Sequence, residues 1–243
     1  MLSLGDLDVP FVSPGTYLRH QVGFPVGSWF EQRIVSADFD AASGKAINIM
    51  CADGQGGSTL CAGTDGRFGT SDDAPEVYLG RPTPDLEGAF TTTLTLWNQL
   101  RLYALVDYKR GMRKVDGNTR VRCYFFGGRC RENFFPEEFA PERIAAIQSS
   151  NNLVDILIAD ASFTKLRELS LSYTIPENWA GMLRATRATV SVAGRNLFTW
   201  TDYPGLEPEA MFLGGSRGGN HTVWEQTTMP QLSQWVVTVN LGF

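Results

Sequence analysis

The closing stretch of the chain, SQWVVTVNLGF (233–243), decides how the rest of the sequence is read. Large apolar side chains on its odd positions alternate with mostly small or polar side chains on its even positions, and this period of two predicts a β-strand. In water, an edge strand of this kind leaves its apolar row and its backbone groups uncovered. A lipid-facing strand in a closed barrel has neither problem, so the pattern predicts a transmembrane β-strand.

The bulk composition narrows the class of protein. The chain has 243 residues and a net charge of −5, which disfavours a nucleic-acid partner. No apolar run approaches the roughly 20 residues that a membrane helix needs. The 25 glycines, 12 prolines and 12% aromatic residues suit an all-β protein with many turns. The first residues (1–6) lack the basic start and apolar core of a secretory signal, so we expect a barrel protein with this start to be part of something longer.

Two hairpins are predicted in the first half of the chain, at 17–35 and at 90–108. In the second hairpin, threonines alternate with apolar residues on one strand, and the reverse face of the other strand carries Arg101, Asp107 and Lys109. Three charges on one face are hard to place in a dry core, whereas a water-filled lumen accommodates them.

Further strands are predicted at 163–175, where Pro176 ends the strand, and at 188–200. Long segments without a sustained period separate the hairpins and strands, and residues 141–148 within one of them predict a short helix. These long segments are 38–84, 110–160 and 202–231. Short turns that alternate with long loops are typical of transmembrane barrels. The predicted fold class is therefore all-β, an antiparallel up-and-down transmembrane β-barrel segment of about seven strands with long extracellular loops and short periplasmic turns.

The alternation assigns a face to the side chains of the predicted strands. The residues expected to face lipid are Leu169, Leu171, Tyr173, Val190, Val192, Val237, Val239, Leu241 and Phe243. The residues expected to face the lumen are Arg101, Asp107, Lys109, Glu168, Arg195 and Asn240.

The four cysteines form two pairs that are close in sequence, Cys51 with Cys61 and Cys123 with Cys130. Each pair lies in a glycine-rich, polar segment, which favours two local disulfides in an oxidising compartment, on extracellular loops of the barrel. Four free thiols are the alternative. Zinc is disfavoured, because neither spacing fits a zinc motif and the chain has only 2 histidines.

One acidic segment, TDGRFGTSDD (64–73), suggests a metal site. Asp65, Asp72 and Asp73, together with nearby carbonyl groups, offer the hard oxygen ligands that calcium prefers. The spacing is not that of an EF-hand, and Asp-Gly is a common turn pair, so an acidic loop without an ion is the alternative.

An enzyme is the least supported class. Carboxylates at Glu207 and Glu209 invite comparison with glycosidases, but no carboxylate has a companion whose role the sequence defines. Neither His20 nor His221 lies near a nucleophile motif, and the glycine-rich runs at 54–57 and 214–219 lack the context of a phosphate loop. We expect no catalytic residue and no cofactor, apart from the candidate calcium ion.

Four strings of the sequence, taken in order, resemble one family. They are VGFPVGSWFEQ (22–32), VYLGRPTPDLEGAFTTTLTL (77–96), ADASFTKLRELSLSYTIP (159–176) and VSVAGRNLFTWTDYPGLEPEA (190–210). With the terminal aromatic residue, they resemble the C-terminal barrel region of SusC/RagA-like TonB-linked outer-membrane transporters. The resemblance covers most of residues 17–243, but the cysteine-bearing inserts lie outside the shared pattern.

The resemblance implies a location and a function. Members of the family are 22-stranded outer-membrane barrels, so this chain is expected to be about the last third of one, without the plug domain and the earlier strands. The complete protein is expected to import an oligosaccharide or a peptide, with energy delivered through TonB and with a SusD-like lipoprotein over its outer loops. The substrate cannot be read from this sequence.

Two alternatives from other classes stay open at this point. One is a secreted, disulfide-stapled β-sandwich that binds a ligand, and it predicts a buried apolar stripe. The other is a carbohydrate-active enzyme on a β scaffold, which predicts turnover that depends on a single carboxylate.

Overall fold

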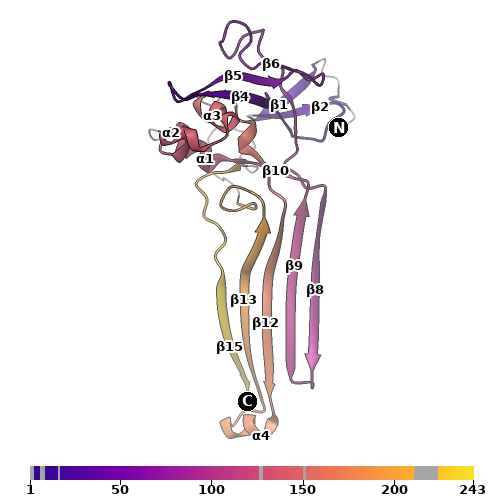
Figure 1. Ribbon diagram of the computed structural model, residues 1–243. Helices are drawn as coiled ribbons and strands as arrows, with labels where there is room; N and C mark the ends of the chain where they lie inside the picture. The colour runs from indigo at the N-terminus through magenta and orange to yellow at the C-terminus, as the bar shows by residue number, and fades with distance from the viewer. Residues whose placement is uncertain (1–2, 6–8, 16, 126–127, 150–151, 211–223) are drawn as a thin grey trace. The chain divides into compact units, whose positions relative to one another are not determined.

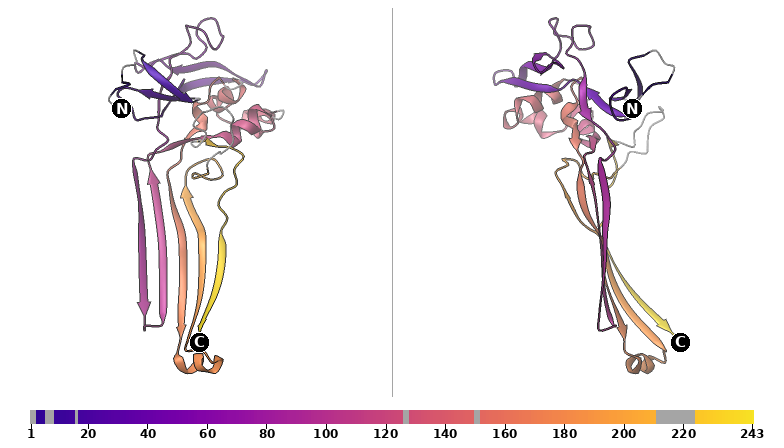
Figure 2. Two further views of the ribbon diagram at one scale, coloured as in Figure 1. Left: turned by 180° about the vertical axis from the view of Figure 1, so that it is seen from behind. Right: turned by 90° about the vertical axis from the view of Figure 1, so that its right-hand side faces the viewer.

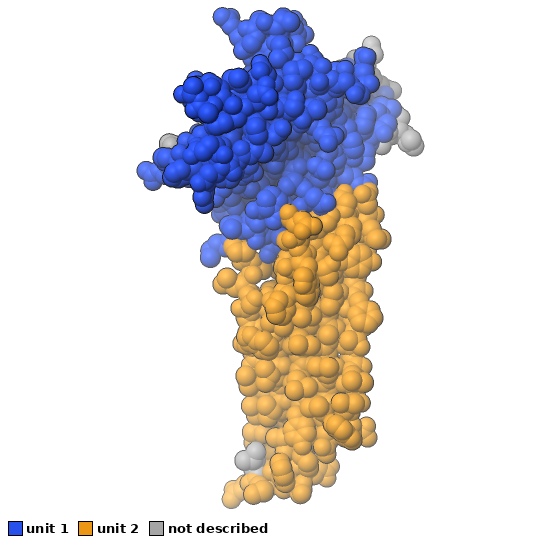
Figure 3. Space-filling model, in the orientation of Figure 1, with its two compact units in different colours: residues 1–83, 112–161, 203–229 blue, residues 84–111, 162–202, 230–243 orange. Residues whose placement is uncertain are grey.

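The computed structural model describes residues 3–5, 9–15, 17–125, 128–149, 152–210 and 224–243. The chain divides into two compact units, which Figure 3 shows in different colours. Unit 1 contains residues 1–83, 112–161 and 203–229, and unit 2 contains residues 84–111, 162–202 and 230–243.

Unit 2 is one antiparallel sheet of five long strands in the order β15-β13-β12-β9-β8. The strands are β8 (Leu86–Leu96), β9 (Leu100–Arg110), β12 (Phe163–Ile175), β13 (Arg187–Thr201) and β15 (Gln234–Gly242). Figure 1 shows them side by side, and the edge-on view in Figure 2 shows that the sheet is a single twisted layer. The described strands form an open sheet, with β8 and β15 at its edges, rather than a closed barrel.

The short connections of unit 2 lie at the same end of the sheet as the chain terminus (Figure 1). Between β8 and β9, Trp97 and Asn98 both have positive φ angles, of 50° and 55°, which is the backbone that a tight type I′ hairpin turn needs. Between β12 and β13 lie α4 (Glu177–Ala180) and the 3₁₀ turn η3 (Gly181–Leu183). The longer connections, from β9 to β12 and from β13 to β15, pass through unit 1.

Strand register in unit 2 agrees with the sequence pattern. Leu94, Leu102, Leu171, Val192 and Val237 are successive partners across the five strands, so they share one face of the sheet. The register shifts between Leu166 and Glu168, where β12 and β13 are both irregular. The sequence-based strands at 90–108, 163–175, 188–200 and 233–243 are confirmed, with shifts of a few residues at their ends.

Unit 1 contains three smaller sheets and several short helices. The sheet orders are β1-β2-β3-β7, β4-β5-β6 and β11-β10-β14. The strands are β1 (Phe11–Gly15), β2 (Leu18–Gln21), β3 (Ser28–Glu31), β4 (Ile34–Asp40), β5 (Lys45–Ala52), β6 (Ser58–Leu60), β7 (Val77–Gly80), β10 (Arg113–Asp116), β11 (Ile158–Asp160) and β14 (Trp224–Glu225). The helical segments are α1 (Gly117–Tyr124), α2 (Arg131–Phe134), η1 (Pro136–Glu138), α3 (Pro141–Gln148) and η2 (Asp155–Leu157). The short helix expected at 141–148 is confirmed as α3.

Two hydrophobic clusters make up much of the core in the described part of unit 1, beside a smaller one at Cys123, Cys130 and Ile147. One surrounds Trp29, whose side chain is fully buried and donates its indole N–H to the Arg113 carbonyl at 3.0 Å. The other surrounds Cys51 and packs the buried face of α3, at Ala145 and Ala146, against β4 and β5. Burial of these apolar groups holds the long inter-strand segments together as a folded unit.

The structure differs from the sequence-based expectation in unit 1. The hairpin expected at 17–35 is confirmed as the antiparallel pair β2 and β3, but these strands belong to a four-stranded sheet of unit 1 and not to the five-stranded sheet of unit 2. The segment 38–84, expected as an aperiodic loop, contains β5, β6 and β7. Strands of three or four residues are too short to show a period of two, and β4 pairs with β5 through two register shifts that break the alternation.

None of the helices in the described residues is long and apolar enough to cross a membrane.

Candidate functional site

One face of the unit 2 sheet is apolar and uncovered; we call it the apolar face. Within the described part of unit 2, no helix lies over this face, and Figure 2 shows the sheet there as a single layer. Val237 is 66% exposed, Val239 59% and Phe90 65%. All nine residues expected to face lipid lie on it or continue its row, as Phe243 does after β15. An exposed apolar surface of this extent is typical of a membrane or protein interface.

The opposite face, which we call the polar face, carries ion pairs. Arg167 forms a bidentate pair with Asp107, with N–O distances of 2.9–3.0 Å. The Glu168 and Arg195 side chains face each other across strands at 3.3 Å. Lys109 lies 3.4 Å from Glu87. Register places Arg101 and Asn240 on the same face, so the structure brings all six residues expected to face the lumen to one side of the sheet.

The strands of unit 2 have the length of transmembrane strands. They span 9 to 15 residues, whereas about 9–11 residues suffice to cross a bilayer. Exposed aromatic side chains mark both ends of the sheet. Trp97 and Phe243 lie at the end with the short turns, and Phe198 stacks on Trp200 toward the other end, with ring centroids 5.9 Å apart. Aromatic residues gather at both interfaces of transmembrane barrels.

In unit 1, a disulfide anchors the loop that carries the candidate calcium ligands. Cys51 is bonded to Cys61, at a sequence separation of 10. The buried Gln32 amide donates to the carbonyls of Cys61 and Ala74, at 2.9 and 2.8 Å, and so joins the two ends of the loop 61–74. The Cys61 end of this loop is therefore held by a covalent bond, and the Ala74 end by hydrogen bonds to Gln32 and to the Cys61 carbonyl.

The second disulfide joins Cys123 in α1 to Cys130, which precedes α2. The buried Glu132 carboxylate lies beside it. Burial alone would raise the pKa of Glu132, but its own backbone N–H and the hydrogen bonds from Arg143, at 2.5 and 2.8 Å, hold that pKa below its usual range. In the described residues, these two cysteines and Glu132 are the one group of three potential metal ligands within 4.8 Å of one another. The disulfide leaves both sulfurs without the negative charge that a metal ligand needs.

The carboxylates of the candidate calcium ligands accept hydrogen bonds from other groups of the same loop. Asp72 accepts hydrogen bonds from the Thr64 backbone N–H (2.7 Å) and from the Thr64 and Thr70 hydroxyls (2.9 and 2.8 Å). These bonds hold the pKa of Asp72 far below its usual range. Asp73 accepts from the Gly69 N–H at 2.6 Å, and Asp65 from the Arg67 N–H at 2.8 Å. Calcium binding at these three residues stays a prediction.

Sequence reasoning missed a buried polar network behind the 203–210 segment. The fully buried Glu225 carboxylate accepts from the backbone N–H groups of Leu206 and Glu207, at 3.0 and 3.2 Å, and from the Asn118 amide at 3.1 Å. Lys114 donates to the carbonyls of Pro208 and Ala210, at 2.5 and 2.6 Å. The hydrogen-bonded residues of this network are 18 to 107 positions apart in sequence, so no local sequence pattern predicts it.

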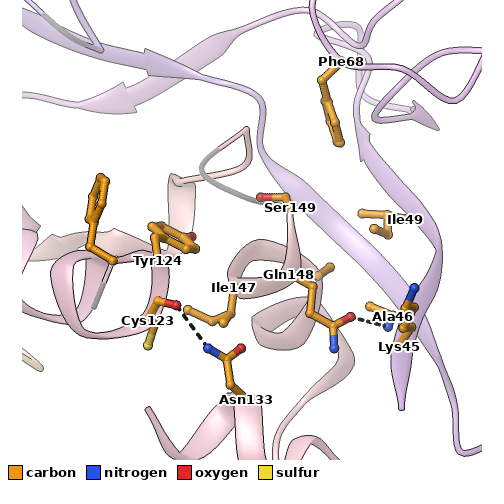
Figure 4. Close-up of a pocket in the computed structure, with 12 residues that line it drawn as sticks. Lys45, Ala46, Ile49, Phe68, Cys123, Tyr124, Asn133, Ile147, Gln148 and Ser149 are labelled. Carbon is orange, nitrogen blue, oxygen red and sulfur yellow. Dashed lines mark hydrogen bonds between the residues drawn. The ribbon is translucent and has the colours of Figure 1, made fainter. Parts of the chain in front are cut away.

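Cavities of ligand size lie in the described part of unit 1. One, of about 630 Å³, lies between β5, α1 and α3 (Figure 4). A second, of about 600 Å³, is lined by Arg19, Glu31 and Glu76, and Arg19 and Glu76 form an ion pair. A third, of about 330 Å³, is lined by Arg33, Arg113 and Asp155.

Two carboxyl groups beside these cavities are shifted toward the neutral form. Burial raises the pKa of Glu31 to about 7 and that of Asp155 to about 6. One Asp155 oxygen accepts from the Ile34 N–H at 2.9 Å. Its other oxygen is buried and has no hydrogen-bond partner in the described residues.

The residues considered for catalysis do not form a catalytic arrangement in the described residues. His20 accepts the Gly27 N–H on its Nδ1 at 3.0 Å, which is a structural role. Glu207 is buried and accepts from the Glu209 N–H at 3.1 Å. His221 and the glycine-rich run 214–219 lie outside the described residues.

Known proteins similar to this chain are receptors and importers. TonB-dependent receptor P3 of Formosa agariphila is 24% identical over the whole of this chain and 25% of its own length. TonB-dependent receptor P26 of the same organism is 28% identical over 62% of this chain and 16% of its own length. No family model matches the chain.

Solved structures give the same result for the fold. The RagAB peptide importer in its closed-closed state matches with a TM-score of 0.67 and 21% identity, over 98% of this chain and 25% of that chain. The RagAB peptide transporter matches with a TM-score of 0.65 and 22% identity, over 97% of this chain and 24% of that chain.

These matches define the class of protein that the chain resembles. The resemblance to TonB-linked, RagA-like outer-membrane receptors indicated by the sequence motifs is confirmed. The chain spans about a quarter of the length of the TonB-dependent receptor P3. Its fold is that of the corresponding part of the RagAB structures, mostly β with antiparallel sheets. The relatives named here are receptors and transporters rather than enzymes, which agrees with the expectation of a non-enzymatic protein.

Proposed function

We propose that this chain forms part of the wall and the outer region of a TonB-dependent importer in a bacterial outer membrane. In this proposal, unit 2 is a segment of a 22-stranded barrel, and neighbouring strands complete the barrel along the free edges of β8 and β15. The plug domain and the earlier strands belong to the same protein outside residues 1–243. The imported nutrient is an oligosaccharide or a peptide.

The observation that carries the proposal is the contrast between the two faces of the unit 2 sheet. The apolar face has no covering layer in unit 2, and the polar face carries ion pairs such as Arg167–Asp107. A soluble β-sandwich covers its apolar face with a second sheet, whereas a barrel wall turns that face to lipid and its polar face to a water-filled lumen.

The connections give the proposed orientation. Transmembrane barrels have short periplasmic turns and long extracellular loops. The turn at Trp97–Asn98 and the chain terminus are then periplasmic, and the folded segments of unit 1 are extracellular, together with both disulfides. A SusD-like lipoprotein would cover this outer side, and TonB would act from the periplasm through regions outside this chain.

The test is spin-label accessibility along β15 in the full gene product, reconstituted in lipid. Single cysteines at Val237, Val239 and Leu241 sample the apolar face, and single cysteines at Thr238 and Asn240 sample the polar face. We expect labels on the first set to collide with oxygen dissolved in lipid, and labels on the second set with a water-soluble nickel chelate. Labels that neither reagent reaches on the odd positions would mean that protein covers the apolar face, and the proposal would be wrong.

A further inference from the structure

The cavity of unit 1 between β5, α1 and α3 is lined mostly by apolar and aromatic side chains, as a binding pocket for an apolar side chain would be. We call it the aromatic pocket; Lys45, Ile49, Phe68, Tyr124, Phe125 and Ile147 are among its lining residues. Figure 4 shows Phe68 and Ile49 on one side of the cavity and Tyr124 and Ile147 on the other. Its volume of about 630 Å³ is within the roughly 300–1,000 Å³ range of small-molecule sites.

Most of the polar side chains in the wall are already bonded to backbone. Asn133 donates both amide hydrogens, to the Cys123 and Gly128 carbonyls at 3.1 and 2.9 Å. The Gln148 amide donates to the Gly44 carbonyl at 2.8 Å and accepts from the Ala46 N–H at 3.0 Å, the bond drawn in Figure 4.

The hydroxyl groups of the wall are bonded in the same way. The Ser149 hydroxyl donates to the Ala146 carbonyl at 2.7 Å and accepts from the Leu153 N–H at 2.9 Å. The Tyr124 hydroxyl donates to the same Ala146 carbonyl at 2.8 Å. A neutral sugar needs several directed hydrogen bonds for its hydroxyl groups, and this wall has few to offer, so it favours an apolar group.

Lys45 is the exception among the polar residues of the wall. Its side chain is exposed, and in the described residues no ion pair or hydrogen bond of its ammonium group is found. Asp40, opposite Lys45 in the β4–β5 pair, accepts hydrogen bonds from the Ala42 N–H and the Ser43 hydroxyl, at 3.1 and 2.5 Å. The pocket therefore combines aromatic walls with one cation that can pair with a carboxylate of a ligand.

Two disulfides anchor segments of the pocket wall. Cys123, which lies in the wall, is bonded to Cys130, and the Cys51–Cys61 bond holds the loop that carries Phe68. A preformed pocket loses less entropy when a ligand binds.

We propose that the aromatic pocket binds the C-terminal residue of a peptide, with an aromatic or large aliphatic side chain between the rings and the terminal carboxylate at Lys45. The inference rests on the proposed import function and narrows its substrate from oligosaccharide or peptide to peptide. Planar side chains pack well between aromatic rings in offset or edge-to-face geometry, which favours phenylalanine or tyrosine at the end of the peptide.

The experiment is calorimetric titration of the full gene product in detergent micelles with four probes. These are the peptide Ala-Ala-Phe with a free carboxylate, the same peptide with a C-terminal amide, Ala-Ala-Ala, and the neutral sugar maltotriose. We expect the free acid to bind about tenfold more tightly than the amide, as for a hydrogen bond to a charged group. We also expect the free acid of Ala-Ala-Phe to bind more tightly than Ala-Ala-Ala, and we expect no binding of maltotriose.

Matched variants locate the binding. Lys45→Met should remove the difference between acid and amide, whereas Arg67→Met, at an exposed cation that does not line the pocket, should keep it. Phe125→Ala should weaken the Ala-Ala-Phe complex, whereas Phe134→Ala, at an aromatic residue that is 66% exposed and outside the wall, should not.

Three results would overturn the inference. They are equal binding of acid and amide to the native protein, an acid–amide difference that survives Lys45→Met, and maltotriose binding that Phe125→Ala weakens. The spin-label test of the membrane proposal is independent of these titrations. Lipid-exposed odd positions without peptide binding would remove only this inference, and peptide binding by a protein whose apolar face is covered would remove only the proposed location.

Discussion

The two units of the chain place their apolar side chains in opposite ways. In unit 1, Trp29 is completely buried, and residues such as Leu18 and Val115 are buried around it. In unit 2, Trp235 is 64% exposed and Val237 66% exposed, on a face that nothing in unit 2 covers. The core residues of unit 1 are buried within their own unit, although single apolar side chains such as Phe134 stay exposed, whereas the whole apolar face of unit 2 needs a partner.

Under the proposed membrane location, the two units fold in two different solvents, water for unit 1 and lipid for the apolar face of unit 2. Apolar burial stabilises a unit in water because it removes surface from water. In a bilayer no such force acts between apolar groups, and the strict requirement is that every backbone group is bonded, which the long antiparallel ladders of unit 2 meet between their edges. The same kind of substitution should therefore have different effects in the two units.

The largest difference is expected between two tryptophans. Trp29→Ala removes a fully buried side chain and its hydrogen bond to Arg113, and should lower the free energy of unfolding by about 3–5 kcal/mol. Trp235→Ala removes a side chain that already contacts solvent or lipid, and should lower it much less. Urea titration of both variants in the same detergent measures the difference, and equal losses would show that Trp235 packs against protein.

The next prediction concerns the two faces of β15. Val239→Arg places a charge on the apolar face and should cost about 2–4 kcal/mol in a bilayer, whereas Thr238→Arg on the polar face should cost much less. The measurement is the folded yield in liposomes, read from heat-modifiable mobility on gels.

A soluble core would also reject arginine at Val239, so an enlarged residue is needed as the control. Lipid accepts the extra volume of Val239→Phe, whereas a close-packed core should lose about 1–3 kcal/mol to overpacking. If Val239→Phe impairs folding as much as Val239→Arg does, the apolar face packs against protein.

The third prediction is that the disulfides, both of which lie in unit 1, contribute to the stability of that unit. Replacing Cys51 and Cys61 by alanine should lower the stability of unit 1 by about 2–3 kcal/mol, from the entropy of a closed loop of this length. Peptide mapping without reductant should show both Cys51–Cys61 and Cys123–Cys130 in material exported to the periplasm. Free thiols at all four positions would contradict the assignment.

Unit 2 could be predicted from the sequence because its strands are long and strictly alternating. Large apolar residues stand at every second position of Trp235–Phe243. An alternation sustained over nine residues leaves only one register that puts all of them on one face. The bulge near Arg167 was not visible in the pattern, although it is what lets Arg167 join Asp107 on the polar face.

Unit 1 could not be predicted in the same way, for a physical reason. Its strands are short, and its stability comes from contacts between residues far apart in sequence, such as Trp29 with Arg113 and Asn118 with Glu225. The aromatic pocket has the same origin, because Lys45, Phe68 and Ile147 meet only in the folded unit. Two local signals in this region are confirmed, the helix 141–148 and the hairpin that pairs β2 with β3.

The fourth prediction is a pH dependence confined to unit 1. Burial raises the pKa of Glu31 to about 7, above its value in the unfolded chain, with a smaller contribution from the nearby Asp155 and an opposing one from Arg19. Such a group favours folding fully below its unfolded pKa, and this contribution is lost as pH rises through about 7. Unit 1 should therefore be more stable at pH 5 than at pH 8, by roughly 1–2 kcal/mol.

Hydrogen exchange of unit 1 amides at the two pH values, corrected for the intrinsic exchange rate, measures this effect. Glu31→Gln keeps the shape of the side chain without its charge and should remove most of the dependence. Glu177→Gln, at an exposed position in unit 2, is the control and should leave it unchanged. A stability of unit 1 that rises between pH 5 and pH 8 would contradict the assignment.

The smallest effect is expected from calcium at the loop 64–73. Asp72 already accepts hydrogen bonds from Thr64 and Thr70. A calcium ion has to replace those bonds, so the net stabilisation is only the free energy of calcium coordination less that of the lost hydrogen bonds. For an extracellular site with a dissociation constant of about 0.1–1 mM, 1 mM calcium should stabilise the unit by roughly 0.4–1.4 kcal/mol.

The measurement is the melting temperature with calcium and with magnesium, which binds poorly to a flexible loop of carbonyls and carboxylates. Asp72→Asn should abolish the calcium-dependent rise, whereas Asp38→Asn, at an exposed aspartate outside the loop, should retain it. An equal rise in both variants would place the ion elsewhere, and no rise in the native protein would make 64–73 an acidic loop held by its own hydrogen bonds.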